Sequence, residues 1–125
     1  MWGILALGLA GLAALVLWRA QVQETRAEHR YPPEGRILSV GGAKVHVVEL
    51  GQGPDLILIH GASGNTRDMT FSLAGKLAND FHVIVFDRPG LGYTPPLDPA
   101  GDSLQSQAAL LQAAASQIGA VRPIV

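Results

Sequence analysis

The feature that most constrains the fold is a short apolar run, Leu-Ile-Leu-Ile at residues 56–59, which stops at His60 and Gly61. A run that is apolar at every position is typical of a strand buried on both faces in a parallel sheet. A loop of small residues, 61–64, follows, and Asn65 or Thr66 can then cap a helix. The loop therefore opens at the carboxyl edge of a parallel sheet, where open α/β folds bind their ligands.

The rest of the pattern alternates strands with helices. Two β-prone runs, 36–40 and 44–50, are joined by Gly41-Gly42, which predicts a hairpin. A second buried strand is predicted over 81–86, and another strand opens at Pro123. Helices are predicted over 67–78 and 103–118, the second capped by Asp102 and ended by Gly119. This order predicts an α/β fold with a mostly parallel sheet and an antiparallel edge.

One face of the predicted second helix carries an apolar stripe. Its members are spaced by three or four positions and are expected to face the core: Leu104, Ala108, Leu111 and Ala115.

The N-terminal segment, residues 2–18, carries no charged side chain. As a helix it would span roughly 25 Å, slightly less than a ~30 Å hydrocarbon core. Trp2 and Trp18 flank it, where indole rings suit the headgroup region. No Lys or Arg precedes the run and no clean Ala-x-Ala site follows it, so we expect a retained membrane anchor. A cleaved signal peptide is the alternative, and it would leave a secreted or periplasmic protein.

Residues 19–34 form a polar segment that ends in Pro32-Pro33, and we interpret it as a helical stalk or linker. Arg19, Arg26 and Arg30 lie just after the apolar span, so the positive-inside rule places the following domain in the cytoplasm. The predicted organisation is therefore an anchor at 1–18, a linker at 19–34 and an α/β domain at 35–125.

Composition excludes several classes of function. The chain has no cysteine, which rules out disulfides and thiol nucleophiles. Its formal net charge is −1 and its nine Lys and Arg residues are scattered, so a nucleic-acid partner is not expected.

Three stretches together resemble the N-terminal part of the α/β-hydrolase family, over residues 35–125. They are the hairpin, then LILIHGASGN, then FHVIVFDRPGLGYT. The resemblance implies that the backbone N–H of Ala62, with Ser63 beside it, contributes to an oxyanion hole. It implies that the neighbouring motif residues support this loop: His60, Gly61, Gly64, Asp87, Arg88, Gly90 and Gly92. It implies no metal or organic cofactor, and a small-molecule substrate.

The same resemblance places the catalytic triad outside these residues. The nucleophile motif G-x-S-x-G would follow the strand that opens at Pro123, just past Val125, with the acid and the histidine later still. The chain is thus expected to be the N-terminal fragment of a membrane-anchored hydrolase of an ester, amide or related bond. Relatives use a Ser or an Asp nucleophile, and the sequence does not choose between them.

Three alternatives stay open at this point. Ser63 lies in Gly-Ala-Ser-Gly-Asn, close to G-x-S-x-G, but the fifth position is Asn65. Asp87 follows the second buried strand and resembles the ribose-binding carboxylate of a Rossmann-like nucleotide-binding fragment. A truncated, non-catalytic membrane protein is the third alternative, and the exposed sheet edge near Pro123 would then pair with a partner or aggregate.

Overall fold

The computed structural model describes residues 2–98 and 102–125. Contacts within the chain divide it into two units, one ending at Pro33 and the other comprising Glu34–Val125. The first unit contains one continuous helix, α1 (Trp2–Arg30). Of the expected stalk or linker, residues 19–34, the part up to Arg30 is therefore helical and continues directly from the apolar segment.

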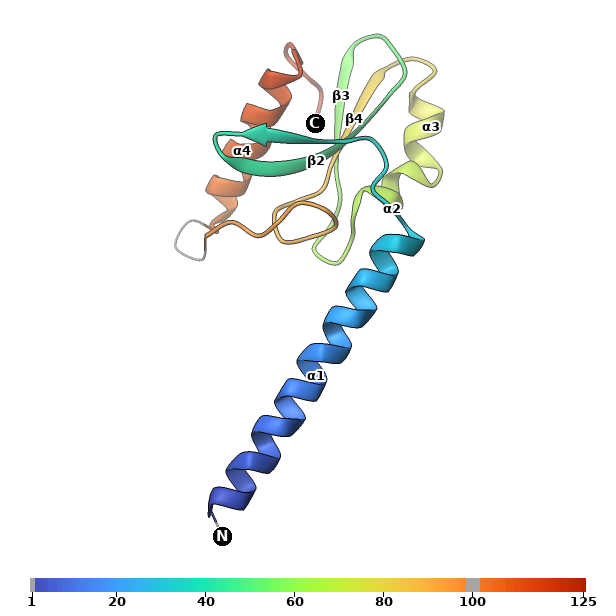
Figure 1. Ribbon diagram of the computed structural model, residues 1–125. Helices are drawn as coiled ribbons and strands as arrows, with labels where there is room; N and C mark the ends of the chain where they lie inside the picture. The colour runs from blue at the N-terminus through green and yellow to red at the C-terminus, as the bar shows by residue number, and fades with distance from the viewer. Residues whose placement is uncertain (1, 99–101) are drawn as a thin grey trace. The chain divides into compact units, whose positions relative to one another are not determined.

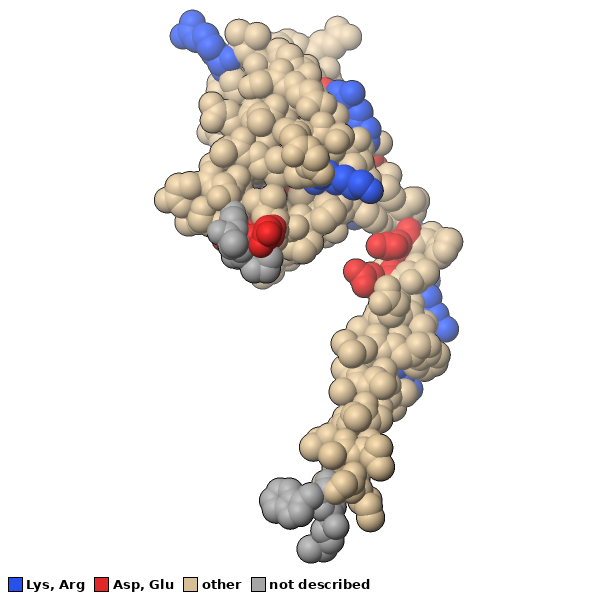
Figure 2. All heavy atoms as spheres, turned by 60° about the vertical axis from the view of Figure 1, so that its left-hand side comes forward, with Lys and Arg blue, Asp and Glu red and all other residues tan. Residues whose placement is uncertain are grey.

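Helix α1 is long and apolar enough to cross a membrane, and none of its apolar window is buried. A signal sequence near the N-terminus has the same properties. Figure 2 shows that the charged side chains of this helix gather in its C-terminal part, while the described N-terminal part is uncharged.

The second unit is built on a four-stranded mixed sheet in the order β1-β2-β4-β3 (Figure 1). Its strands are β1 (Arg36–Val40), β2 (Ala43–Leu50), β3 (Asp55–Ile59) and β4 (His82–Phe86). Strand β2 pairs antiparallel with both β1 and β4, whereas β3 and β4 are parallel. The predicted hairpin is confirmed, since Gly41 and Gly42 both have positive φ (56° and 87°), as a type I′ turn requires.

Helices cover both faces of this sheet (Figure 1). Helix α4 (Leu104–Gln117) packs on one face, over a core that includes Val45, Val47, Ile84 and Phe86. Helices α2 (Thr66–Thr70) and α3 (Leu73–Leu77) pack on the other, where the core includes Val48, Val83, Val85 and Ala74. Alternation along β2 and β4 thus sends successive side chains to two separate cores.

Three helix predictions need correction. The single helix expected over 67–78 is two short helices, because the chain leaves helical geometry at Ser72 (φ −148°). Ser103, not Asp102, caps α4, and its side chain accepts from the Ser106 N–H. In the expected apolar stripe, Leu111 and Ala115 are buried, whereas Leu104, in the first turn, is 71% exposed and Ala108 is exposed as well.

The strand predicted to begin at Pro123 is seen as a single β-bridge to β3. Ile124 forms a parallel bridge with Leu56, and it exchanges backbone hydrogen bonds with Asp55 and Ile57 at 2.9 and 2.8 Å. A groove of about 540 Å³ lies beside this pairing, and Ile57, Ile59 and residues of α4 line it.

Candidate active site

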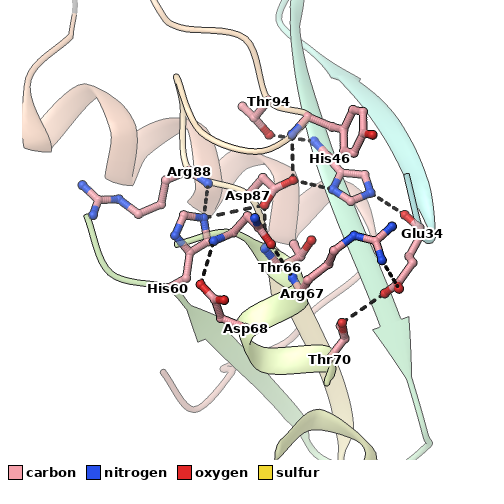
Figure 3. Close-up of polar contacts among 12 residues, drawn as sticks. Glu34, His46, His60, Thr66, Arg67, Asp68, Thr70, Asp87, Arg88 and Thr94 are labelled. Atoms are coloured by element: carbon pink, nitrogen blue, oxygen red, sulfur yellow. Dashed lines mark hydrogen bonds and ion pairs between the residues drawn. The ribbon is translucent and has the colours of Figure 1, made fainter. Parts of the chain in front are cut away.

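Three polar side chains lie in a row across the sheet, where β3 and β4 end (Figure 3). Phe86 is the last paired residue of β4, and the next residue of that chain segment is Asp87. The antiparallel ladder places His46 of β2 beside Asp87, and the parallel ladder places His60 on its other side. Residues in register on neighbouring strands point to the same face. All three therefore point to the face that α2 and α3 cover.

Asp87 joins three separate segments through one carboxylate, which is fully buried. Its Oδ2 lies 2.7 Å from Nδ1 of His46 and accepts the Tyr93 N–H at 2.9 Å. Its Oδ1 accepts the N–H of Thr66, the first residue of α2, at 2.7 Å. The carboxylate thereby connects β2, the start of α2 and the loop after β4.

The pKa of the Asp87 carboxyl is lowered from its usual value. Burial acts in the opposite direction, but the hydrogen bonds from His46, Tyr93 and Thr66 together outweigh it. The pKa of the His46 imidazole is raised. Burial again opposes the shift, and the hydrogen bonds to Asp87 and to the Glu34 carbonyl, with the nearby negative charge, outweigh it.

His60 connects the two loops by a different set of bonds. Its Nε2 accepts the Arg88 N–H at 3.0 Å, so the ring proton lies on Nδ1, which donates to the Gly61 carbonyl at 2.9 Å. Nε2 is also 3.7 Å from Oδ1 of Asp87, which is too long for a hydrogen bond. The Arg88 side chain extends to α4, where it donates to Gln107 Oε1 at 3.1 Å.

Two glycines predicted to support the loop lie against this network. Gly92 has a φ of +55°, and a Cβ there would overlap the Asp87 carboxylate. A Cβ at Gly64 would meet the end of the Asp68 side chain and the ring of His60. Gly90 also has a positive φ, while a Cβ at Gly61 would meet open space.

The loop that carries Ala62 and Ser63 is exposed and follows β3 directly. Gly64 N–H donates to the Gly61 carbonyl at 3.2 Å, which closes a tight turn. Within residues 2–98 and 102–125, no hydrogen bond uses the backbone N–H of Ala62 or Ser63. These donors are therefore available to an acceptor from outside the domain.

Four residues of this network have no predicted role in the site: His46, which lies in the predicted hairpin, and Thr66, Tyr93 and Thr94. Thr94 Oγ1 accepts the backbone N–H of His46 at 2.9 Å. The available signal was the polar His46 within the otherwise apolar run Val45–Val48, because a buried polar side chain needs partners.

The structure does not fit the two alternative roles considered for Asp87 and Ser63. The Asp87 carboxylate is buried and already accepts three hydrogen bonds, so it cannot reach a ribose. A serine nucleophile needs a base within hydrogen-bond reach. In the described part of the chain, the Ser63 hydroxyl has no such histidine.

A second polar cluster lies at the other end of the same strands, where β3 and β4 begin. His82, the first residue of β4, bonds through Nδ1 to Oδ1 of Asp55 at 2.7 Å, and its Nε2 is 3.4 Å from Glu49. The Asp55 carboxyl also accepts the Val121 N–H at 2.8 Å. The hydrogen bonds from His82 and Val121 lower the pKa of Asp55. These hydrogen bonds link the segment that follows α4 to β3, at the end of the strands away from the loops described above.

Comparisons with known proteins agree with this geometry. A sequence profile described as "Alpha/beta hydrolase family" matches residues 56–125, more than half of the chain. The uncharacterized hydrolase YraK of Bacillus subtilis (strain 168) is 40% identical over 53 residues, which are 42% of this chain and 19% of that protein.

Solved structures are similar as well. The epoxide hydrolase CorEH has a TM-score of 0.62 and 26% identity, covering 67% of this chain and 29% of that one. A bacterial membrane phospholipase A has a TM-score of 0.62 and 25% identity, covering 89% of this chain and 40% of that one. The chain thus spans less than half the length of each of these relatives.

Proposed function

Because this chain belongs to the alpha/beta hydrolase family, we propose that it supplies the oxyanion-binding part of a hydrolase active site. The single observation that carries the proposal is the pair of unused backbone N–H groups at Ala62 and Ser63. They lie on a loop at the carboxyl ends of β3 and β4 and are therefore free to bind a negatively charged oxygen. The reaction proposed is hydrolysis of an ester, amide or related bond in a small-molecule substrate.

The rigid surroundings of the loop support this role. Catalysis by hydrogen-bond donors requires that they be held in place before charge develops on the substrate. His60 precedes the loop and is fixed by the Arg88 N–H, while Thr66 follows it and is fixed by Asp87. The nucleophile, acid and base would come from the part of the protein that corresponds to the rest of the relatives' chains.

We also propose that the hydrolase is attached to a membrane through α1. Residues 34–125 make up less than three quarters of the chain, so the 89% match to the membrane phospholipase A extends into α1. The match to CorEH covers 67% of the chain, which is less than the share that the second unit makes up. The arginines that follow the apolar segment favour a cytoplasmic domain.

The test is an Ala62→Pro variant in the protein expressed from its complete reading frame, assayed on 4-nitrophenyl acetate. Proline removes the Ala62 N–H, so we expect kcat to fall about a hundredfold to a thousandfold, as for loss of one oxyanion donor. Circular dichroism of the variant checks that the fold is retained. An Ala62→Pro variant that folds and keeps its full kcat would contradict the proposal.

A Ser63→Ala variant distinguishes this proposal from a nucleophilic role for that serine. The substitution removes the hydroxyl and keeps both backbone N–H groups. Loss of all turnover in Ser63→Ala would assign the nucleophile to Ser63 and contradict the proposed division of roles.

A further inference from the structure

The buried imidazole of His46 has no part in the function proposed above, yet both of its ring nitrogens face acceptors (Figure 3). Nδ1 lies 2.7 Å from the Asp87 carboxylate, and Nε2 contacts the backbone carbonyl of Glu34. These partners can only accept, so each ring nitrogen must carry a proton. The hydrogen bonds therefore require an imidazolium in a position that is 1% exposed.

The other charged and titratable groups near His46 are compatible with a positive ring. The Glu34 carboxylate is turned toward α2, where it pairs with Arg67 at 3.1 Å. Tyr93 meets the imidazole edge-on, with ring centroids 5.5 Å apart. His60 lies on the far side of Asp87 and uses its Nε2 to accept a backbone N–H. Asp87 is thus the anion that balances the His46 charge at short range.

The His46 contact also determines how Asp87 can bind its other partners. With Oδ2 held by Nδ1 of His46 and the Tyr93 N–H, Oδ1 is directed at the Thr66 N–H. Thr66 begins α2, immediately after the loop of Ala62 and Ser63. Rotation of the carboxylate would release that end of the loop.

We propose that His46 is a positioning residue, whose protonated ring orients Asp87 and thereby holds the Ala62 loop in its anion-binding geometry. This inference rests on the proposed oxyanion role of Ala62. His46 does not touch the substrate in this scheme and acts only through Asp87.

The proposal has a defined pH dependence. The pKa of His46 is raised, so its contribution is complete below the ordinary histidine value of about 6.5 and is lost as pH rises through the raised value. The pKa of Asp87 is lowered, so the negative charge of its carboxylate is lost only when pH falls through the lowered value. We therefore expect kcat to decrease on the alkaline side in the wild type, and this decrease to be absent in His46→Gln.

The activity test compares His46→Gln with His82→Gln in the protein expressed from its complete reading frame. His82 is the matched control, because it also donates to an aspartate at 2.7 Å but lies at the other end of β4, away from the Ala62 loop. With 4-nitrophenyl acetate, we expect His46→Gln to lower kcat about tenfold to a hundredfold while KM stays within about twofold. His82→Gln should keep the wild-type kcat. Equal kcat in the two variants would overturn the proposal.

Nuclear magnetic resonance of the ¹⁵N-labelled wild-type chain supplies a readout that needs no activity and no variant. We expect both ring nitrogens of His46 to carry protons at pH 6, below the ordinary histidine pKa of about 6.5. A ring nitrogen without a proton at that pH would overturn the proposal even if His46→Gln failed to fold.

Absence of ester hydrolysis by the wild type would count against the hydrolase proposal and leave the positioning role to be decided by amide hydrogen exchange. Positioning predicts that the Thr66 and Tyr93 amides lose protection in His46→Gln and keep it in His82→Gln. Unchanged protection of both amides in His46→Gln would overturn the inference.

Discussion

Asp87 illustrates how a single buried carboxylate orders a loop region. It follows a strand and accepts hydrogen bonds from β2, from α2 and from the loop after β4. Two of the three donors, His46 and Thr66, lie far from Asp87 in the sequence, and the third, Tyr93, lies six residues after it. A buried carboxylate is tolerated only when it is paired and hydrogen-bonded, and this requirement fixes the residues around it.

Gly92 is the residue most closely fitted to that carboxylate. A Gly92→Ala variant would place a methyl group against Asp87 at a φ of +55°, which L-residues other than Asn and Asp rarely adopt. We expect its free energy of unfolding to fall by about 2 kcal/mol or more. Urea unfolding followed by circular dichroism measures this change.

Gly75 provides the control for this substitution. It lies in α3, where a Cβ would meet nothing within 4 Å. Gly75→Ala should raise the free energy of unfolding by up to about 1 kcal/mol, because alanine favours a helix. If Gly92→Ala were as stable as Gly75→Ala, the close packing of Asp87 against Gly92 would be wrong.

At the scale of elements, the two short helices differ in how they begin. Asn65 caps α2: its side chain accepts the Arg67 N–H at 2.8 Å, and Asp68 accepts the Asn65 N–H at 3.1 Å. Ser72 precedes α3 without a capping hydrogen bond from its side chain. The capping pattern at Asn65 was readable from the sequence, whereas the break at Ser72 was not.

An Asn65→Ala variant is expected to lower the free energy of unfolding by about 1 kcal/mol, because it removes an N-terminal cap. Ser72→Ala is the matched substitution at the start of α3, and we expect a change within about 0.5 kcal/mol. Thermal or urea unfolding of the two variants tests the difference. A larger loss in Ser72→Ala than in Asn65→Ala would contradict this account of the helix starts.

At the scale of the whole molecule, the two units have opposite solvent preferences. Helix α1 exposes Leu, Ile and Val side chains along its N-terminal part, such as Ile4 at 78% exposure. The second unit buries its apolar residues in two cores on either side of the sheet. A helix that is apolar on all sides is stable in a bilayer and not in water, since each such residue favours insertion by about 0.3–0.6 kcal/mol.

We therefore expect the expressed chain to remain in the membrane fraction after alkaline carbonate extraction. Deletion of residues 2–18 should release it, while deletion of residues 19–30, which keeps the apolar segment, should not. Mass spectrometry of the N-terminus checks the signal-peptide alternative, because detection of a mature protein starting after residue 18 would exclude a retained anchor.

The sequence by itself determined the local features of this protein: the apolar N-terminal helix, the Gly41-Gly42 hairpin, the positions of β3 and β4, and the loop at Ala62. Each depends on periodicity or on turn residues within a few positions, and local patterns report such features well. The expected burial of β3 on both faces was wrong, because only Ile57 of that strand is buried and Ile59 is 42% exposed. Only the tertiary structure decided the strand order β1-β2-β4-β3 and, with it, the row formed by His46, Asp87 and His60. Pairing between distant strands is set by packing of both sheet faces, and no local pattern in the sequence encodes which residues it brings together.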